Sequence, residues 1–216
     1  YLLHGAGGDH SGWVARTEVA KLSDKYNMIV FCPDGGRTSW YFDSPIDPSY
    51  QYETHVAREC VSFVDKNYRS QSNRESRAIC GLSMGGHGAI FLAIRHKETF
   101  SIALVLSGGV DIRPFPKHWE IKKRLGGINT HRDNWEKYTV INQAKKLKDG
   151  DLVISIDCGT EDFFLKVNRE LHEQLLSDGI THEYVEHPGA HNWEYWQKAI
   201  KRQMPLADKY FKGIGR

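Results

Sequence analysis

The chain of 216 residues lacks the features that mark several common classes of protein. It has no apolar run near the roughly 18 residues that a membrane-spanning helix needs. Its formal net charge is only +2, and lysine and arginine are scattered along the chain instead of forming a basic stripe, which argues against a nucleic-acid partner. The sequence therefore predicts neither a membrane span nor a nucleic-acid interface.

Cysteine is also scarce, and no two cysteines form a C-x-x-C pair. Each one lies in an apolar run, which predicts buried free thiols and not disulfides. Unpaired thiols favour a reducing compartment and hence the cytoplasm. A periplasmic or secreted location stays open, because the chain begins without Met at Tyr1 and a signal peptide could precede it. The four cysteines are Cys32, Cys60, Cys80 and Cys158.

Motifs for metals and cofactors are missing as well. No H-E-x-x-H occurs among the eleven histidines, so we expect no catalytic metal. A glycine-rich stretch at residues 5–8 matches neither the G-x-x-x-x-G-K-[ST] phosphate loop nor the G-x-G-x-x-G dinucleotide pattern. The sequence thus predicts a protein that needs no metal and no cofactor.

What the chain does contain is a regular alternation of strand-like and helical patterns. Several strand candidates are continuous apolar runs, as expected for strands buried on both faces of a parallel sheet. Helical periodicity appears at residues 52–68, where Val56, Cys60, Phe63 and Val64 are predicted to share one face. Repeated βα units predict one α/β domain over residues 1–216, with a mostly parallel sheet covered by helices on both faces. The expected strands are residues 1–4, 27–32, 76–82, 101–106, 152–158 and 181–186.

Two connections, at about residues 33–50 and 107–138, are longer than a βα unit requires. Long aromatic-bearing loops at strand ends often build or cover a binding site. The same aromatic residues could instead pack the loops onto the body of the protein, and the sequence leaves both interpretations open. The candidates for substrate contact are Trp40, Tyr41, Phe42, Trp119 and Trp135.

Between an apolar strand and an apolar helix the chain reads Gly81-Leu82-Ser83-Met84-Gly85. This is the strand–turn–helix setting of a G-x-S-x-G nucleophile elbow, in which a sharp turn lifts the serine hydroxyl to the edge of the sheet. The flanking glycines suit a turn that has no room for a Cβ. Ser83 is therefore the predicted nucleophile of an α/β-hydrolase fold.

A serine needs a base, and the base needs an orienting acid. In elbow enzymes these follow in the chain order Ser, Asp or Glu, His. Asp162 comes just after the strand at 152–158, and His191 lies on a short loop before the last helix. We therefore predict a triad of Ser83, Asp162 and His191.

Four neighbouring residues are alternatives for these roles. Asp157 lies within a strand and is expected to be structural, whereas Glu161 is a weaker candidate for the acid. His187 is a weaker candidate for the base, and His87 follows the serine on its own helix, where it cannot easily approach the hydroxyl from the side of the base.

An oxyanion hole completes the chemistry that such a triad needs. One donor is expected to be the N–H of Met84, the residue after the nucleophile, and the second comes from the loop after the first strand. That loop reads His4-Gly5-Ala6-Gly7-Gly8, and we assign the second donor to the Ala6 N–H. His4 is predicted to shape the loop.

These motifs together resemble the esterase D family. The resemblance rests on residues 2–8 with Trp13, residues 81–86, residues 157–163 and Gly189-Ala190-His191, and it covers nearly the whole chain. The family includes tributyrin esterases, S-formylglutathione hydrolases, feruloyl and acetyl-xylan esterases, and mycolyltransferases of the antigen 85 type. Residues 39–54 look closest to the tributyrin-esterase branch. Family members begin with a strand or two before the position of Tyr1, so the resemblance implies that N-terminal strands are missing here.

The resemblance implies the same triad and oxyanion hole, and it implies a serine carboxylesterase that acts on short-chain acyl or aryl esters through an acyl-enzyme. An S-formylglutathione-type thioesterase or an acyltransferase on the same triad is an alternative, and a non-catalytic binding module is a weaker one. The expected partner is a small-molecule or carbohydrate-linked ester. The oligomeric state stays open, with a homo-oligomer among the options.

Overall fold

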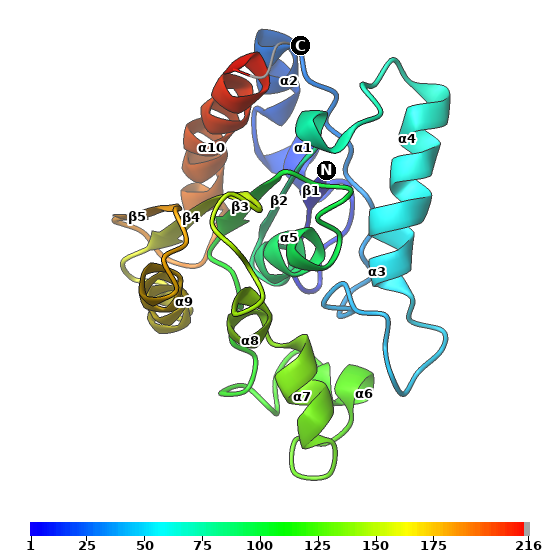
Figure 1. Ribbon diagram of the computed structural model, residues 1–216, viewed down its shortest axis with the longest axis vertical. Coiled ribbons are helices and arrows are strands. Elements are labelled where there is room, and N and C mark those ends of the chain that lie inside the picture. Colours follow the sequence, from blue (N-terminus) through cyan, green and yellow to red (C-terminus); the bar gives the residue numbers. More distant parts are fainter. Residues whose placement is uncertain (214–216) are drawn as a thin grey trace.

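A parallel sheet of five strands forms the centre of the computed structural model, which describes residues 1–213 (Figure 1). The strands lie in the order β1-β2-β3-β4-β5, and every neighbouring pair is parallel. The predicted mostly parallel sheet is thus confirmed, with strand ends shifted by one or two residues. The strands are β1 (Leu2–Leu3), β2 (Ala78–Leu82), β3 (Ile102–Leu106), β4 (Val153–Gly159) and β5 (Glu183–His187).

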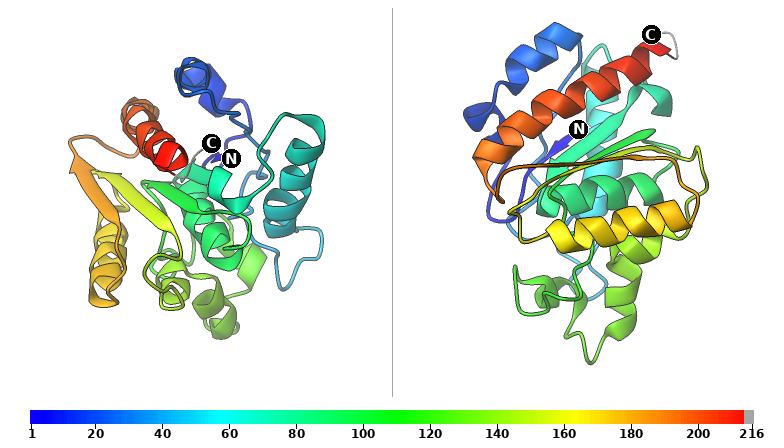
Figure 2. Two further views of the ribbon diagram at one scale, coloured as in Figure 1. Left: turned by 45° about the horizontal axis from the view of Figure 1, so that its top comes forward. Right: turned by 90° about the vertical axis from the view of Figure 1, so that its left-hand side faces the viewer.

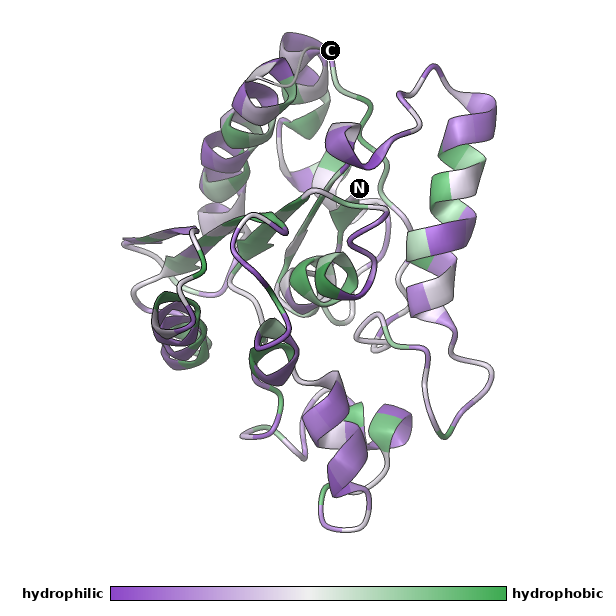
Figure 3. Ribbon diagram, in the orientation of Figure 1, coloured by the Kyte–Doolittle hydropathy of each residue, from purple (hydrophilic) through white to green (hydrophobic). Residues whose placement is uncertain are grey.

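Helices cover both faces of this sheet, as Figure 2 shows from two sides. In β3, Ala103 and Val105 face one apolar cluster, while Leu104 and Leu106 face the other. Both faces of the central strands are therefore buried, which explains why β2, β3 and the helix after β2 are almost uniformly hydrophobic in Figure 3. On the first face lie α5 (Met84–Arg95), α8 (Val140–Ala144) and α9 (Leu165–Ser177); on the second lie α1 (Gly12–Arg16), α2 (Val19–Tyr26) and α10 (Trp193–Gly213).

The predicted strand at residues 27–32 is wrong. The Asn27 and Met28 N–H groups cap α2, donating to the carbonyls of Asp24 and Ser23. Within residues 1–213, β1 makes one backbone hydrogen bond to this segment, 2.8 Å long, from the Leu2 N–H to the Phe31 carbonyl. One bond beside a two-residue strand does not make a ladder, although the segment runs alongside β1.

The predicted helix at 52–68 forms, but a turn of π-helix interrupts it. Its parts are α3 (Tyr52–Thr54), the π-helical η1 (His55–Cys60) and α4 (Val61–Asn67). The extra residue of a π turn rotates the side chains that follow it. Val61 is consequently buried, whereas Phe63, predicted to face the core, is 49% exposed.

The two long connections pack against each other below the sheet in Figure 1. The Ser44 hydroxyl donates to the Arg124 carbonyl at 2.6 Å, and the Tyr138 hydroxyl donates to the Asp43 carbonyl at 2.9 Å. Segments far apart in the sequence thus form one layer beneath α5. The second connection carries α6 (Ile121–Leu125) and α7 (Arg132–Tyr138), and the remaining short helix is the 3₁₀ turn η2 (Arg74–Ser76).

All four cysteines are free thiols, as the sequence predicted. Three are buried, but Cys32 is only half-buried, because its segment lies at the edge of the sheet. Burial raises the pKa of Cys60 to about 11 and that of Cys80 to about 12, so both stay protonated near neutral pH.

Candidate active site

Ser83 stands in a strained turn between β2 and α5, with φ 57° and ψ −118°. Few side-chain-bearing residues adopt such angles, and the strain is held in place by close backbone contacts. A Cβ on Gly81 would lie 2.2 Å from the Gly85 carbonyl oxygen, and a Cβ on Gly85 would lie 2.5 Å from the Leu3 carbonyl oxygen. Only glycine fits at either position, so the motif reflects the geometry of the turn.

A chain of hydrogen bonds runs from Ser83 through His191 to Asp162. His191 Nε2 lies 2.9 Å from Ser83 Oγ, and Nδ1 lies 2.9 and 2.8 Å from the two carboxylate oxygens of Asp162. A carboxylate can only accept, so Nδ1 carries the proton and the lone pair of Nε2 faces the serine hydroxyl. The Asp162 side chain is 0% exposed, that of His191 is 12% exposed, and Ser83 is 8% exposed. This arrangement can draw the proton from the hydroxyl.

Paired loops after β4 and β5 hold the acid beside the histidine. The Thr160 N–H donates to the His187 carbonyl at 2.9 Å, and the Glu161 N–H donates to the Gly189 carbonyl at 3.0 Å. Gly159 makes this approach possible, because a Cβ there would lie 2.1 Å from the Gly189 oxygen. The two loops therefore act as one rigid support.

Two of the alternative residues have a different place in the structure. Asp157 is fully buried on the side of α10, where Arg202 binds it with Nε and a terminal nitrogen, both at 2.9 Å, and the Tyr195 hydroxyl donates to it. Glu161 is exposed to solvent. Asp157 is thus a structural residue, as predicted, and neither carboxylate contacts the histidine of the triad.

The histidine alternatives also lie away from the serine hydroxyl. His87 is completely buried, with its Nδ1 3.1 Å from the Gly109 carbonyl oxygen. Desolvation lowers the pKa of His87 to about 4, so this ring is neutral near pH 7. The backbone of His187 joins the two loops through its carbonyl, while the hydrogen bond to Ser83 comes from His191.

The loop after β1 lies directly against the serine. A Cβ on Gly5 would be 3.2 Å from Ser83 Cβ. His4 shapes this loop, as expected: its Nε2 accepts from the Gly35 N–H at 2.8 Å, and its Nδ1 lies 2.9 Å from the Gly5 carbonyl oxygen. The neighbouring Ala6 N–H meets no acceptor within residues 1–213. Met84 is the first residue of α5, where an N–H has no partner within the helix.

Four of the five aromatic candidates are buried in the protein core. The Tyr41 hydroxyl donates to the His4 carbonyl at 2.9 Å, and Trp135 Nε1 donates to the Gly126 carbonyl at 2.9 Å. Their side chains are almost fully enclosed, which favours packing, one of the two interpretations that the sequence left open. The buried four are Trp40, Tyr41, Phe42 and Trp135, and the half-buried one is Trp119.

Phe163, which the sequence did not single out, is the exposed aromatic residue beside the triad. It follows Asp162 directly, is 54% exposed, and has its ring centroid 4.1 Å from that of His191. It stacks on Trp119 at 5.9 Å with an interplanar angle of 18°. Its position next to the predicted acid was the only sequence signal that could have found it.

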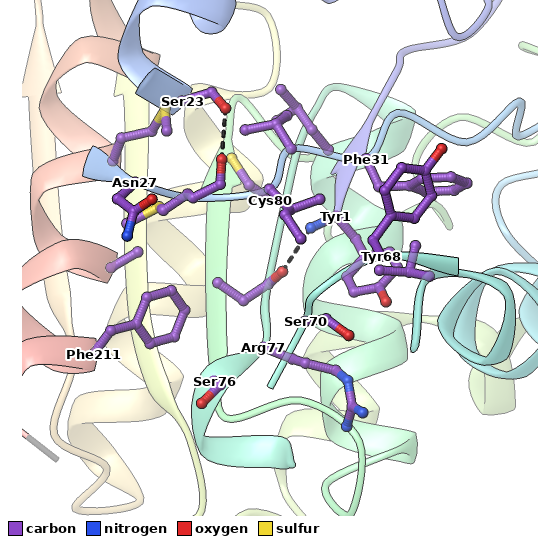
Figure 4. Close-up of a pocket in the computed structure, with 18 of the residues that line it drawn as sticks. Tyr1, Ser23, Asn27, Phe31, Tyr68, Ser70, Ser76, Arg77, Cys80 and Phe211 are labelled. Atoms are coloured by element: carbon purple, nitrogen blue, oxygen red, sulfur yellow. Dashed lines mark hydrogen bonds between the residues drawn. The ribbon is translucent and has the colours of Figure 1, made fainter. Parts of the chain in front are cut away.

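Two cavities lie near the sheet. One of about 660 Å³ opens beside the Gly7–Gly8 turn of the loop after β1, with polar side chains such as Arg37 and His55 in its lining. Another of about 960 Å³ lies between α2, α4 and α10, lined by side chains that include Tyr1 and Phe211 (Figure 4). Neither cavity has Ser83, Asp162 or His191 in its lining.

Within residues 1–213, no helix has the length and hydrophobicity to cross a bilayer. The same part of the chain holds no cluster of three or more histidine, cysteine or acidic side chains arranged to hold a metal ion.

The parallel sheet, with the strained turn at the end of β2, defines the chain as an α/β-hydrolase. The sequence model of the family described as "Putative esterase" matches residues 1–206, and the chain belongs to that family. It is therefore an enzyme that hydrolyses carboxylic ester bonds.

Individual relatives agree with this assignment. The chain is 29% identical to an acetyl esterase of Caldicellulosiruptor saccharolyticus over 93% of its own length and 79% of the relative's. It is 24% identical to the S-formylglutathione hydrolase of Bos taurus, covering 82% of this chain and 68% of that one. The solved structure of a ferulic acid esterase superposes with a TM-score of 0.82 at 26% identity, covering 98% of this chain and 84% of the other.

Proposed function

We propose that the chain is a serine esterase that works through an acyl-enzyme formed on Ser83. The observation that carries the proposal is that His191 contacts both partners at once, with Nε2 2.9 Å from the serine hydroxyl and Nδ1 bound to Asp162. Ser83 attacks the ester carbonyl while His191 takes its proton and passes it to the leaving alcohol. Water, activated by His191, then attacks the acyl-enzyme and releases the acid.

Asp162 keeps His191 in the tautomer that this cycle needs and stabilises the imidazolium that forms. The Ala6 and Met84 N–H groups bind the negative oxygen of the tetrahedral intermediate. The contact of Gly5 with Ser83 and the open Ala6 amide support this assignment. Loss of one such donor typically slows turnover by ~10²–10³.

The preferred substrates are esters of short-chain or aromatic acids, including those linked to carbohydrate. The names of the acetyl esterase and ferulic acid esterase relatives support this range. Residues 33–50 and 107–138 pack together as one layer beneath α5. We assign this layer and the sheet to one domain. Hydrolysis of S-formylglutathione is a second candidate, which the similarity to the Bos taurus enzyme supports.

A Ser83→Ala variant tests the mechanism. We expect turnover of p-nitrophenyl acetate to fall by ~10⁶, as when a triad serine is removed from a protease. A fluorophosphonate reagent should label wild-type Ser83 and leave the variant unlabelled. Retention of the wild-type rate by the variant would refute the assignment, and absence of any adduct on Ser83 would favour a binding module.

A substrate panel separates the candidates that share this triad. It comprises p-nitrophenyl esters of increasing chain length, methyl ferulate, acetyl-xylan and S-formylglutathione. Activity confined to S-formylglutathione would identify a thioesterase and overturn the proposed esterase range.

A further inference from the structure

Phe163, which is exposed, and Trp119, which is half-buried, form an aromatic wall at the edge of the active site. Their rings are stacked, with centroids 5.9 Å apart and an interplanar angle of 18°. Phe163 keeps 54% of its surface in solvent, although the neighbouring Phe164 is almost fully buried. Of these two adjacent aromatic residues, one is buried and the other is exposed, and the exposed one lies beside the catalytic centre.

The wall is rigid, because three other aromatic rings hold Trp119 in place. Its ring packs on those of Trp40 at 5.8 Å, Phe115 at 5.5 Å and Phe164 at 5.3 Å. The Trp119 carbonyl also accepts a hydrogen bond of 3.4 Å from Trp40 Nε1. A ligand that stacks on this surface would therefore meet a preformed site and would not have to order it.

His191 does not need Phe163 to hold its position. The imidazole is already fixed by Asp162 and by two buried rings, Trp196 at 4.9 Å and Phe164 at 5.3 Å, both nearly perpendicular to it. Phe163 adds a fourth contact at 4.1 Å while leaving more than half of its surface open. An exposed apolar ring in this position is suited to binding substrate.

The wall lies on the side of the site from which the leaving group departs. His191 protonates the departing oxygen in the proposed cycle, so the alcohol part of the ester must lie next to the imidazole. The loop at Gly5 and Ala6, which binds the carbonyl oxygen in that cycle, approaches Ser83 instead. A ring carried by the alcohol would consequently meet Phe163 first.

We propose that Phe163, supported by Trp119, is a specificity-determining residue that binds a leaving alcohol carrying a ring with a flat apolar face. The ring can be aromatic or a pyranose, because both stack on aromatic side chains. This inference rests on the proposed function and narrows its substrates on the alcohol side.

Three acetates of primary alcohols test the inference: ethyl acetate, benzyl acetate and 6-O-acetylglucose. All three form the same acetyl-enzyme, so differences in kcat/KM report only on the alcohol. In Phe163→Ala we expect kcat/KM for a ring-bearing ester to fall roughly fivefold to tenfold, the range of an aromatic stacking contact. The value for ethyl acetate should stay within about twofold of wild type. A loss confined to benzyl acetate identifies an aryl alcohol, and a loss confined to the sugar ester identifies a pyranose.

Two variants serve as controls. Phe163→Tyr keeps the ring and should keep the wild-type preference, whereas Leu176→Ala removes an equally exposed apolar side chain from α9, with 59% exposure, and should change no substrate. An equal loss on all three acetates would overturn the inference and make Phe163 a support for His191. Unchanged kinetics on all three would overturn it as well. If the wild-type enzyme hydrolyses none of the three, the proposed activity on short-chain acyl esters fails.

Discussion

Asp157 and Arg202 form a two-pronged ion pair on the face of the sheet opposite α5, with both N···O distances at 2.9 Å. The Asp157 side chain is fully buried, and it also receives the Tyr195 hydroxyl. The pair therefore ties the end of β4 to α10, the helix that follows the loop of His191. It stabilises the scaffold and takes no direct part in the chemistry.

Replacing each of the two buried aspartates by asparagine should separate scaffold from catalysis. Asp157→Asn leaves Arg202 without its carboxylate, and we expect the free energy of unfolding to fall by about 3 kcal/mol. Its kcat, measured below the unfolding temperature, should stay within about threefold of wild type. Asp162→Asn should lower kcat by ~10⁴, because the amide favours the wrong imidazole tautomer. Urea denaturation and ester hydrolysis measure both effects, and the opposite pattern would exchange the two roles.

Gly85 should be intolerant of any side chain. A Cβ there would lie 2.5 Å from the Leu3 carbonyl oxygen and 2.6 Å from that of His4, and neither backbone group can move away freely. We expect Gly85→Ala to lower stability by about 1–3 kcal/mol through overpacking. It should also lower kcat/KM by at least ~10², because it moves Ser83 away from the loop after β1.

Gly213→Ala is the matched control for this substitution. Gly213 ends α10, and a Cβ there would meet no atom within 4 Å. Stability should be unchanged or higher by up to about 1 kcal/mol, with full activity. Equal behaviour of the two alanine variants would show that the turn at Gly85 has more room than the contacts indicate.

The contact among the three predicted triad residues could be foreseen, because strand ends of a parallel sheet meet at one edge. Apolar runs identify the strands before Ser83 and Asp162. The strand before His191 is more polar, and there the chain order limits the choice. The structure brings the three within hydrogen-bond distance. What sequence reasoning could not supply is the pairing of the loops, in which Gly159 and Gly189 touch through their backbones.

The aromatic residues show where sequence reasoning stops. Composition cannot separate Trp40, which is buried against His87, from Phe163, which is half in solvent. Whether each ring is buried or exposed depends on where the two long connections meet. Contacts between segments far apart in the sequence set that meeting point. The prediction of a strand at 27–32 fails for a similar reason, because an apolar run becomes a strand only where a partner offers a ladder.

The buried His87 should make stability depend on pH. Its ring is completely enclosed, and desolvation lowers its pKa from 6.5 to about 4. The unfolded chain binds a proton at this site below about pH 6.5, whereas the folded protein resists it until about pH 4. The stability contribution of the neutral ring is therefore complete above about pH 6.5 and is lost as the pH falls toward 4.

A His87→Leu variant isolates this contribution, because leucine cannot titrate. Between pH 7.5 and pH 4.5 the wild-type free energy of unfolding should fall by about 2–3 kcal/mol more than that of the variant. Urea denaturation at a series of pH values measures the difference. His10→Leu removes an exposed histidine and should follow the wild-type curve. Parallel curves for wild type and His87→Leu would mean that the enclosed ring accepts a proton as easily as it does in the unfolded chain.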